Sequence, residues 1–305
     1  MPTGAARTMA SMRVGVIDVG SNTARLLVAA PERRGLTTIL SERTHLGLGA
    51  DIERNGEISE PKIVEAAELA GRYAALARSC GAERLEVLVT APGRQGRNAK
   101  LLRRALGDSS RAAVRQLSAE EEGLLAYAGA VAACRSKAKI VAVCDVGGGS
   151  TQLMVGRRRG PAWLRSLDLG SLRLTERFHR ADPPDPAELS ASCQAVRETF
   201  MGVVAPVPQL ALATGGTARS LRRIVGRRLD VRELRAARWL VSVEPSVKIA
   251  HEYGITPERA RTLAAGATIL LEARRRLGVP FEVARGGVRE GAALALLAEL
   301  AEAAA

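Results

Sequence analysis

Polar and apolar positions follow one another along the chain in short blocks of two kinds. Short apolar runs predict strands, and apolar residues spaced three or four positions apart predict helices. Glycine, proline and N-capping residues stand between the blocks and mark their ends. The expected strands are two that end at Asp18 and Asp145, together with 26–30, 36–42, 84–90, 112–117, 152–155, 162–167, 210–214 and 281–284, and the expected helices are 59–79, 98–106, 120–134, 186–201, 217–225, 257–277 and a last one from Arg289. This alternation predicts an α/β class with mixed sheets flanked by helices.

A segment near the start of the chain is repeated in its second half. VGVIDVGSNT at 14–23 and VAVCDVGGGST at 141–151 both read as an apolar run, Asp-Val-Gly, and then small hydroxyl or amide residues. Two further expected strands joined by a turn follow each copy, and each copy then reaches a Leu-Gly pair, at 46–47 and at 169–170. Because the order of elements is the same, the repeat predicts two related domains that face each other.

Glycine-rich turns follow three of the expected strands. Glycine permits positive φ values, and its missing side chain lets an oxyanion approach the backbone N–H groups. The third turn, ATGGT at 213–217, also opens a helix, whose N-terminus favours an anion. One such turn is often a plain connector, whereas three of them behind apolar strands predict phosphate binding. The candidate phosphate-binding residues of these turns are Gly20, Ser21, Asn22, Thr23, Gly147, Gly148, Gly149, Ser150, Thr151, Gly215, Gly216 and Thr217.

Asp18 and Asp145 stand at equivalent points, where their strands end. A carboxylate does not bind phosphate directly, but Mg²⁺ usually binds through one or two carboxylates together with waters and substrate phosphates. The alternative is that each aspartate orders its own turn by accepting backbone N–H groups. With both copies facing one cleft, Asp145 is the first candidate for a Mg²⁺ ligand and Asp18 the second.

The segment Ser118-Ala119-Glu120-Glu121-Glu122 opens an expected helix. Ser118 and Glu121 have the spacing of a capping box, and the helix dipole favours acids in the first turn, so helix stability explains Glu120 and Glu121. Glu122 lies about 100° further around the helix and is not needed for the cap. A helix start between the glycine turns would bring Glu122 to a water beside a terminal phosphate, which makes it the candidate catalytic residue.

The chain is strongly basic. In 305 residues, 45 Lys and Arg against 32 Asp and Glu give a net charge of +13 and a sequence pI near 10.6. Two causes stay open: a genome composition that enriches arginine and alanine, or a positive surface that concentrates a polyanion. Aromatic residues are only 3% of the chain and no zinc-finger or helix-turn-helix pattern is present, which argues against nucleic acid as a partner.

The sequence also bears on the compartment. No stretch approaches the roughly 20 apolar residues of a membrane span. Residues 1–12 lack the apolar segment of a secretory signal and are expected to form a disordered tail. Four cysteines without CxxC spacing, at positions 80, 134, 144 and 193, indicate buried thiols in a reducing cytoplasm. We therefore expect a cytoplasmic protein with no membrane partner.

Taken together, these motifs resemble the exopolyphosphatase and guanosine pentaphosphate phosphohydrolase (Ppx/GppA) family, within the sugar kinase, Hsp70 and actin superfamily. The carriers of the resemblance are VGVIDVGSNTARLLV (14–28), LSAEEEGLLAYAG (117–129), VAVCDVGGGSTQLMVG (141–156), SLDLGSLRLTERF (166–178), ATGGTARSL (213–221) and GGVREG (286–291). It implies two duplicated ribonuclease H-like (actin-like ATPase) domains, each with a mixed five-stranded sheet, and an active site in the cleft between them. The first domain is expected at 13–125 with the terminal helix 290–305, and the second at 126–289.

The resemblance also implies an activity, Mg²⁺-dependent hydrolysis of terminal phosphoanhydride bonds. The proposed base of the family falls on Glu122 and its metal-linked aspartate on Asp145. Arg94 falls where the family places an arginine that contacts phosphate, and Arg25 and Arg289 lie at further arginine-bearing positions. The implied substrate is inorganic polyphosphate, from which orthophosphate is released, with guanosine pentaphosphate as the alternative. Members of the family often dimerise, so a homodimer is left open.

Two positions depart from the family pattern. Gln152 stands seven residues after Asp145, where the family usually has Glu, and this removes a negative charge from the metal site. Gln95 follows Arg94 where the family has Asp. Because both changes remove an acid near the cleft, a third function stays open: a non-catalytic sensor that binds polyphosphate or guanosine tetraphosphate.

Overall fold

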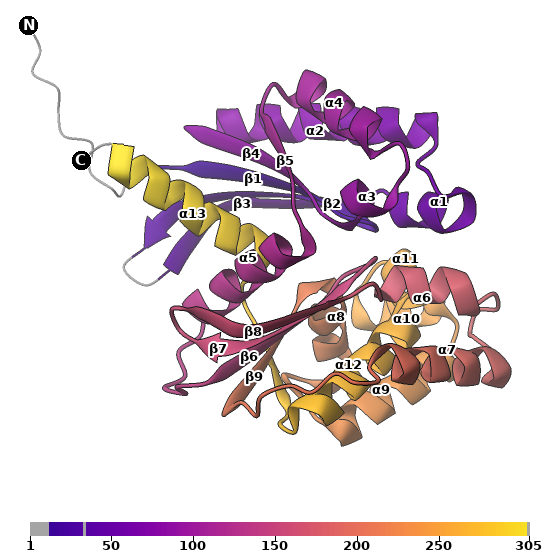
Figure 1. The fold of residues 1–305 in the computed structure, drawn as a ribbon. Coiled ribbons are helices and arrows are strands. Elements are labelled where there is room, and N and C mark those ends of the chain that lie inside the picture. The colour runs from indigo at the N-terminus through magenta and orange to yellow at the C-terminus, as the bar shows by residue number, and fades with distance from the viewer. Residues whose placement is uncertain (1–11, 33–34, 304–305) are drawn as a thin grey trace, which may run out of the picture.

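The computed structural model describes residues 12–32 and 35–303. Two mixed sheets flanked by helices confirm the α/β class (Figure 1). The elements are β1 (Val14–Val19), β2 (Thr23–Glu32), β3 (Gly35–His45), α1 (Leu48–Asn55), α2 (Glu60–Ser79), β4 (Arg84–Val89), α3 (Ala91–Gln95), α4 (Ala99–Ser110), β5 (Ala113–Gln116), α5 (Ala119–Ala132), β6 (Val141–Val146), β7 (Thr151–Arg157), β8 (Gly160–Leu167), α6 (Ser171–Phe178), α7 (Pro186–Thr199), β9 (Leu210–Thr214), α8 (Gly215–Val225), β10 (Arg228–Leu229), α9 (Val231–Val243), α10 (Ser246–Tyr253), α11 (Pro257–Arg261), α12 (Leu263–Leu277), β11 (Phe281–Val283) and α13 (Val288–Ala303). The expected tail lies outside the described residues except for Met12, which is buried.

The two sheets have the same topology. The first has the strand order β3-β2-β1-β4-β5 and the second β10-β11-β9-β6-β7-β8. In each, an antiparallel meander (β1–β3 or β6–β8) continues into parallel strands, β4 and β5 in the first sheet and β9 and β11 in the second. The second sheet differs from the expected five strands by β10, a two-residue edge strand. We call the parts built on the two sheets the first and second domains.

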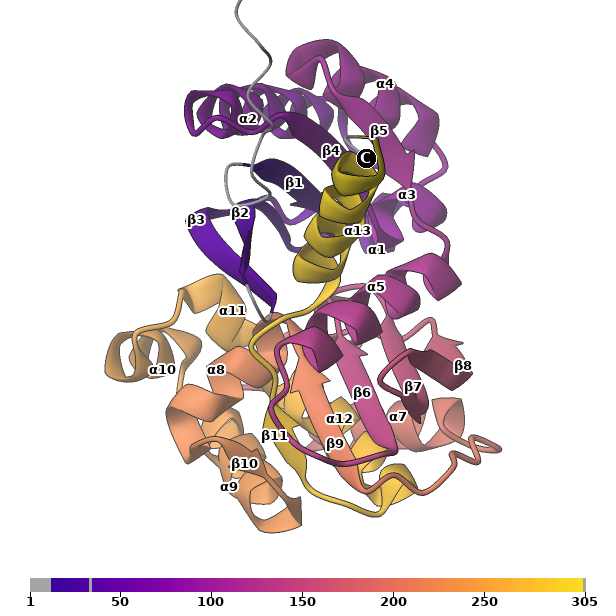
Figure 2. The same ribbon diagram turned by 90° about the vertical axis from the view of Figure 1, so that its left-hand side faces the viewer.

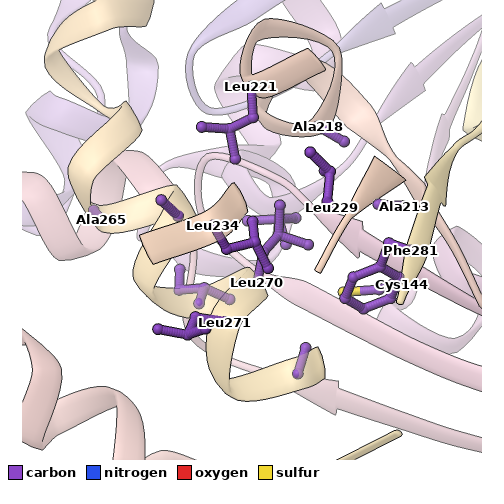
Figure 3. Packing of buried hydrophobic residues seen from close by; sticks show 14 of the residues in the cluster. Cys144, Ala213, Ala218, Leu221, Leu229, Leu234, Ala265, Leu270, Leu271 and Phe281 are labelled. Carbon is purple, nitrogen blue, oxygen red and sulfur yellow. The ribbon is translucent and has the colours of Figure 1, made fainter. Parts of the chain in front are cut away.

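Helices cover both faces of each sheet. In the first domain α2 and α4 pack on one face and α13 on the other. In the second domain α8, α9 and α12 pack on one face, while α5 packs on the other. The core of the second domain is built mainly from alanine, leucine and valine, with Phe281 beside Cys144 among the few large side chains (Figure 3). Apolar residues on both sides of the central strands β1, β6 and β7 therefore account for the layers.

The chain passes between the domains twice, through α5 and into α13, and these two helices cross each other (Figures 1 and 2). At the crossing, a Cβ atom on Gly129 would lie 2.7 Å from the backbone nitrogen of Gly291. Only glycine lets the two helices approach this closely. The crossing fixes where the two sheets face each other and so positions the turns at their strand ends.

Five helices were missed by the sequence pattern. Four are short, α1, α3, α6 and α10, and the fifth is α9, with 13 residues. Helices α1 and α6 follow the two Leu-Gly pairs, and their first turns are stabilised by the glycine turns: Gly49 N–H donates to the Ser21 carbonyl and Arg173 N–H to the Gly148 carbonyl. The single helix expected at 257–277 is divided at Thr262, whose hydroxyl donates to the Arg259 carbonyl. The turn expected at 32–35 is described only at its ends, which belong to β2 and β3.

No helix in the described ranges is both long enough and apolar enough to cross a membrane. The four cysteines are free thiols. Cys144 is fully buried, but Cys80, Cys134 and Cys193 are only partly buried, so full burial was predicted correctly for one of the four.

Candidate active site

The first two glycine turns lie against each other at the interface of the domains. The same hydrogen bond closes both turns, from Gly20 N–H to the Thr23 carbonyl (3.0 Å) and from Gly147 N–H to the Ser150 carbonyl (2.9 Å). A Cβ atom on Gly149 would lie 2.5 Å from the Ser21 hydroxyl oxygen. The two turns are therefore close enough to hold one anion between them.

The third turn completes the site from the second domain. Gly215 has a φ of 87°, and a Cβ atom there would lie 2.6 Å from the Asp145 carboxylate. The next residue, Gly216, is just as close to arginine: a Cβ atom on it would lie 2.9 Å from Arg25 and 2.7 Å from Arg259. The start of α8 thus meets a carboxylate on one side and two guanidinium groups on the other.

A cavity of about 90 Å³ lies where the three turns converge. Its lining comes from both domains, and Asp18 and Asp145 share it. The residues that line it are Asp18, Gly20, Ser21, Asn22, Thr23, Arg25, Thr90, Ala91, Glu122, Asp145, Val146, Gly147, Gly148, Gly149, Ser150, Thr214, Gly215, Gly216, Arg219, Arg259, Gly287, Val288, Arg289 and Glu290. Most of the residues predicted from the sequence are therefore brought together in one place.

Glu122 enters this cavity from the first turn of α5. The capping box predicted for Ser118 and Glu121 is present, and it leaves the Glu122 carboxylate free to turn inward. Glu122 is only 6% exposed. Burial raises its pKa to about 7, although the Arg94 guanidinium, 2.8 Å from its Oε2, acts in the opposite direction. A carboxylate with a pKa near neutrality is suited to accept a proton.

Arg94 holds Glu122 in place without lining the cavity. Its guanidinium also donates to the Leu117 carbonyl (2.9 Å) and to the Ser150 hydroxyl (3.2 Å). Gln152, fully buried on β7, donates to the same hydroxyl (3.0 Å). This network links the base candidate to the second glycine turn.

Neither aspartate of the cavity forms an ion pair with another described residue. Burial raises the pKa of Asp145 to about 6, and it also raises the pKa of Asp18. The buried Oδ1 of Asp18 and Oε1 of Gln152 have no hydrogen-bond partner. The described part of the chain contains no cluster of three or more His, Cys, Asp or Glu side chains able to hold a metal ion. Oxygen ligands this few fit Mg²⁺ of the kind that phosphates and water help to coordinate.

Four arginines line the cavity: Arg25, Arg219, Arg259 and Arg289. Burial lowers the pKa of Arg259 to about 9, and burial followed by the charge of Arg219 lowers the pKa of Arg25. The buried Nε of Arg259 has no partner. Acids of the same cavity offset part of this charge, as in the Arg289–Glu290 pair at 3.5 Å, and a bound anion would offset more.

Sequence reasoning missed two of these arginines. Arg219 lies within the ATGGTARSL segment, one helical turn into α8, and its place after the third glycine turn could have identified it. Arg259 lies on the short helix α11, whose sequence carries no signal for a site. Its position depends on the packing of α11 against α8, which a single sequence does not reveal.

Some predicted residues do not reach the cavity. Besides Arg94 and Gln152, they are Thr151 and Thr217, both fully buried. The Thr151 hydroxyl donates to the Leu169 carbonyl (2.6 Å), and Thr217 packs against Gly266. Both threonines contact the protein interior rather than the space between the turns.

Gln95 lies at the domain interface. Its amide donates to the Gly149 carbonyl (3.1 Å) and to the Asp168 carboxylate (2.6 Å), both in the second domain. Ion pairs between α1 and α6 continue this contact, with Arg54–Glu176 at 2.9 Å and Arg173–Glu53 at 2.8 Å. These bonds hold the domains together beside the cavity.

Comparison with known proteins gives concordant results. The model of the Ppx/GppA phosphatase family matches residues 27–300. Exopolyphosphatase 1 of Mycobacterium tuberculosis is 28% identical, over 92% of this chain and 87% of its own. Guanosine-5′-triphosphate,3′-diphosphate pyrophosphatase of Pseudoalteromonas translucida is 24% identical, over 93% of this chain and 59% of its own. The crystal structure of the Aquifex aeolicus Ppx/GppA family member superposes with a TM-score of 0.78 at 25% identity, over 96% of this chain and 98% of that one.

Proposed function

The chain belongs to the Ppx/GppA phosphatase family, and from that premise we propose that this phosphoanhydride hydrolase releases orthophosphate from the ends of inorganic polyphosphate. The observation that carries the proposal is the buried carboxylate of Glu122, with a pKa of about 7, beside two amide-lined turns. The reaction requires a held phosphoryl group and a proton acceptor next to it, and the cavity offers both.

The terminal phosphoryl group would bind between the first and second glycine turns. Their backbone N–H groups and the hydroxyls of Ser21 and Ser150 are donors on opposite sides of the cavity. The cavity of about 90 Å³ between these donors has room for such a group. Fixed donors of this kind stabilise charge on the equatorial oxygens without reorganising during the reaction.

Glu122 would act as the general base. It accepts a proton from a water molecule whose oxygen attacks the terminal phosphorus, and the bond from that phosphorus to the bridging oxygen breaks. The products are orthophosphate and a chain shorter by one phosphoryl group. Arg94 keeps the carboxylate oriented and lowers its pKa, so that part of it is ionised at neutral pH.

Mg²⁺ is proposed as the cofactor. Asp145 and Asp18 would hold it together with water and phosphate oxygens, and when bound it neutralises charge on the phosphate. The four cavity arginines would bind the phosphoryl groups that do not react, because their clustered charge favours a polyanion.

The decisive test is Glu122→Gln. Removing a general base typically lowers kcat by about 10²- to 10⁴-fold while substrate binding persists. Orthophosphate release from polyphosphate is measured with Mg²⁺ and with EDTA, and the exposed neighbour variant Glu120→Gln serves as the control. Equal release by both variants would remove Glu122 from the mechanism.

Guanosine pentaphosphate is the second candidate substrate. The Pseudoalteromonas translucida relative, which aligns with 93% of this chain, carries that activity in its name. Parallel assays with polyphosphate and guanosine pentaphosphate rank the two by kcat/KM. A sensor without catalysis would bind both compounds and release orthophosphate from neither.

A further inference from the structure

A second hollow lies in the second domain, outside the active-site cavity. Helix α5 packs over β6, β7 and β8 and reaches Leu212 of β9, and the same face of β11 and β10 beyond it carries no helix among the described residues (Figure 2). Strand register places Arg228 and Glu282 side by side on this open face, next to Leu212. The groove between them and the end of α5 has a volume of about 710 Å³. This is the size of sites that bind small molecules, about 300–1,000 Å³.

The groove is rich in arginine. Its arginines come from separate segments: the end of α5, the last turn of α8, the approach to β10, β10 itself and the segment after β11. They are Arg135, Arg222, Arg227, Arg228 and Arg285. Five of the eighteen lining residues are thus arginine, against 40 in 305 for the whole chain, and the one acid among them is Glu282. Overall composition therefore does not explain the enrichment.

These arginines have few partners within the protein. Among the described residues, the one ion pair that they form is Arg228–Asp230, at 3.9 Å and largely exposed. Exposed pairs at this distance contribute little. Because the other four guanidinium groups form no ion pair with the part of the chain that the structure describes, and because they bring like charges to one groove, an anion bound there would gain several charge-assisted hydrogen bonds.

The floor of the groove is apolar. Its partly exposed residues are Leu210, Val279 and Pro280, while Leu212 and Ala284 are buried. Phe281 contributes no accessible ring, because its side chain lies in the core on the opposite face of the sheet (Figure 3). An inorganic polyphosphate would gain nothing from such a floor, and a single-stranded nucleic acid would lack the aromatic platform on which its bases usually stack. An anion that also carries a flat, apolar part matches both features.

We propose that this groove is a separate binding site for an organic phosphate of nucleotide size, with its phosphates against the arginines and its base on the apolar floor. The groove shares no lining residue with the active-site cavity. The close backbone contact between Gly129 and Gly286 lies between the two. The inference does not depend on which compound the active site hydrolyses.

The test uses ATP as the probe and the full chain in EDTA, which withholds the Mg²⁺ that the proposed hydrolysis requires. The groove variant carries Arg227→Gln and Arg228→Gln at two exposed positions, and its melting temperature checks that it is folded. Its matched control carries Arg232→Gln and Arg235→Gln, exposed arginines of α9 outside the groove. Calorimetric titration should give an ATP affinity at least about tenfold lower for the groove variant and unchanged for the control, since each lost charge-assisted contact is worth about tenfold.

Two further arms distinguish nucleotide binding in the groove from binding in the active site and from general polyanion binding. Arg25→Gln alters the active-site cavity and should leave the groove's affinity for ATP within about twofold of the wild type. Tripolyphosphate, which has the charge of ATP without the base, should bind the groove at least about tenfold more weakly. Loss of ATP binding in Arg25→Gln alone would place the nucleotide in the active site and overturn the proposal. Equal affinity for tripolyphosphate and ATP would also overturn it, because the groove would then be a polyanion surface.

Discussion

The first and second glycine turns are closed by the same backbone hydrogen bond, but different side chains face their aspartates. Asp18 lies directly opposite Arg25 on the neighbouring strand, and Asp145 lies at the same place opposite Gln152. Burial raises the pKa of both aspartates. Arg25 acts against this effect at Asp18, and Arg219 and Arg25 act against it at Asp145, whose pKa still rises to about 6. The first half thus carries an arginine opposite its aspartate, and the second carries an amide there, with Glu122 lining the same cavity.

The glycines of the two turns also differ in the room around them. A Cβ atom on Gly20 would find its nearest neighbours at 3.5 Å, an ordinary contact. A Cβ atom on Gly149 would lie 2.5 Å from Ser21, 2.8 Å from Gln95 and 2.9 Å from Ala91, all in the first domain. Gly149 is therefore pressed against the first domain and tolerates no side chain.

Among the variants that test this comparison, the largest effect is expected from Gly149→Ala. The added methyl group would push the two turns apart, and a displacement of about 1 Å from reacting groups can cost on the order of 10²-fold in rate. We expect kcat/KM for orthophosphate release to fall by about 10²-fold, with a melting temperature that shows the variant is folded.

Gly20→Ala is the matched control for that experiment. It places the same methyl group at the first turn, where there is room, and the rate should stay within about threefold of the wild type. If both variants keep full activity, the close contact between the turns does not position the reacting group.

The next effect tests the charge of the first half directly. Arg25→Gln places an amide opposite Asp18, as Gln152 is placed opposite Asp145 in the second domain. Loss of one charge-assisted contact to phosphate should lower kcat/KM by about 10- to 100-fold, mainly through KM. The control is Arg115→Gln, which removes a remote arginine of β5 that pairs with Glu86 at 3.1 Å. Equal kinetics for the two variants would mean that Arg25 does not contact substrate.

The next prediction concerns the pH dependence of the rate, which Glu122 should govern. Glu122 works as a base only when ionised, and its pKa is about 7, so the rate should fall by about tenfold for each pH unit below that value. Arg94 lowers this pKa, and Arg94→Gln should therefore move the acid limb to higher pH. Arg97→Gln, an exposed neighbour, should leave the limb where it is. A profile flat from pH 5 to 8 would contradict the assignment of the base.

Much of the fold and of the candidate site was readable from the sequence, because it depends on local patterns. Apolar runs that end in Asp-Val-Gly gave the repeat, both meanders and the turns, and the helix start at Ser118 gave the position of Glu122. These features depend on neighbours within a few residues. The parallel strands and the mixed character of the sheets followed from the alternation of strands and helices.

What the sequence did not reveal depends on long-range packing. Arg259 comes to the cavity from α11, far along the chain, and short helices such as α1 and α6 are stabilised by bonds to the glycine turns rather than by their own periodicity. The same reason applies to Thr151 and Thr217. Their residue type fits phosphate binding, but strand pleat and helix direction turn both hydroxyls into the protein.

The smallest effect is expected where the second half is given back an acid. Gln152 is fully buried opposite Asp145, its amide donates to Ser150, and its Oε1 has no partner. Gln152→Glu adds a carboxylate oxygen, which Mg²⁺ prefers to an amide oxygen, so the Mg²⁺ concentration for half-maximal rate should fall by about three- to tenfold. The same charge should raise the pKa of Asp145 when no metal is bound.

Gln152→Ala separates the charge from the lost hydrogen bond. It also removes the contact to Ser150 but adds no acid, so the Mg²⁺ concentration for half-maximal rate should not fall. Mg²⁺ titrations of the rate and of binding by calorimetry compare the three proteins. If Gln152→Glu and the wild type reach half-maximal rate at the same Mg²⁺ concentration, the cation does not bind beside Gln152. The difference between Arg25 and Gln152 would then affect phosphate binding only.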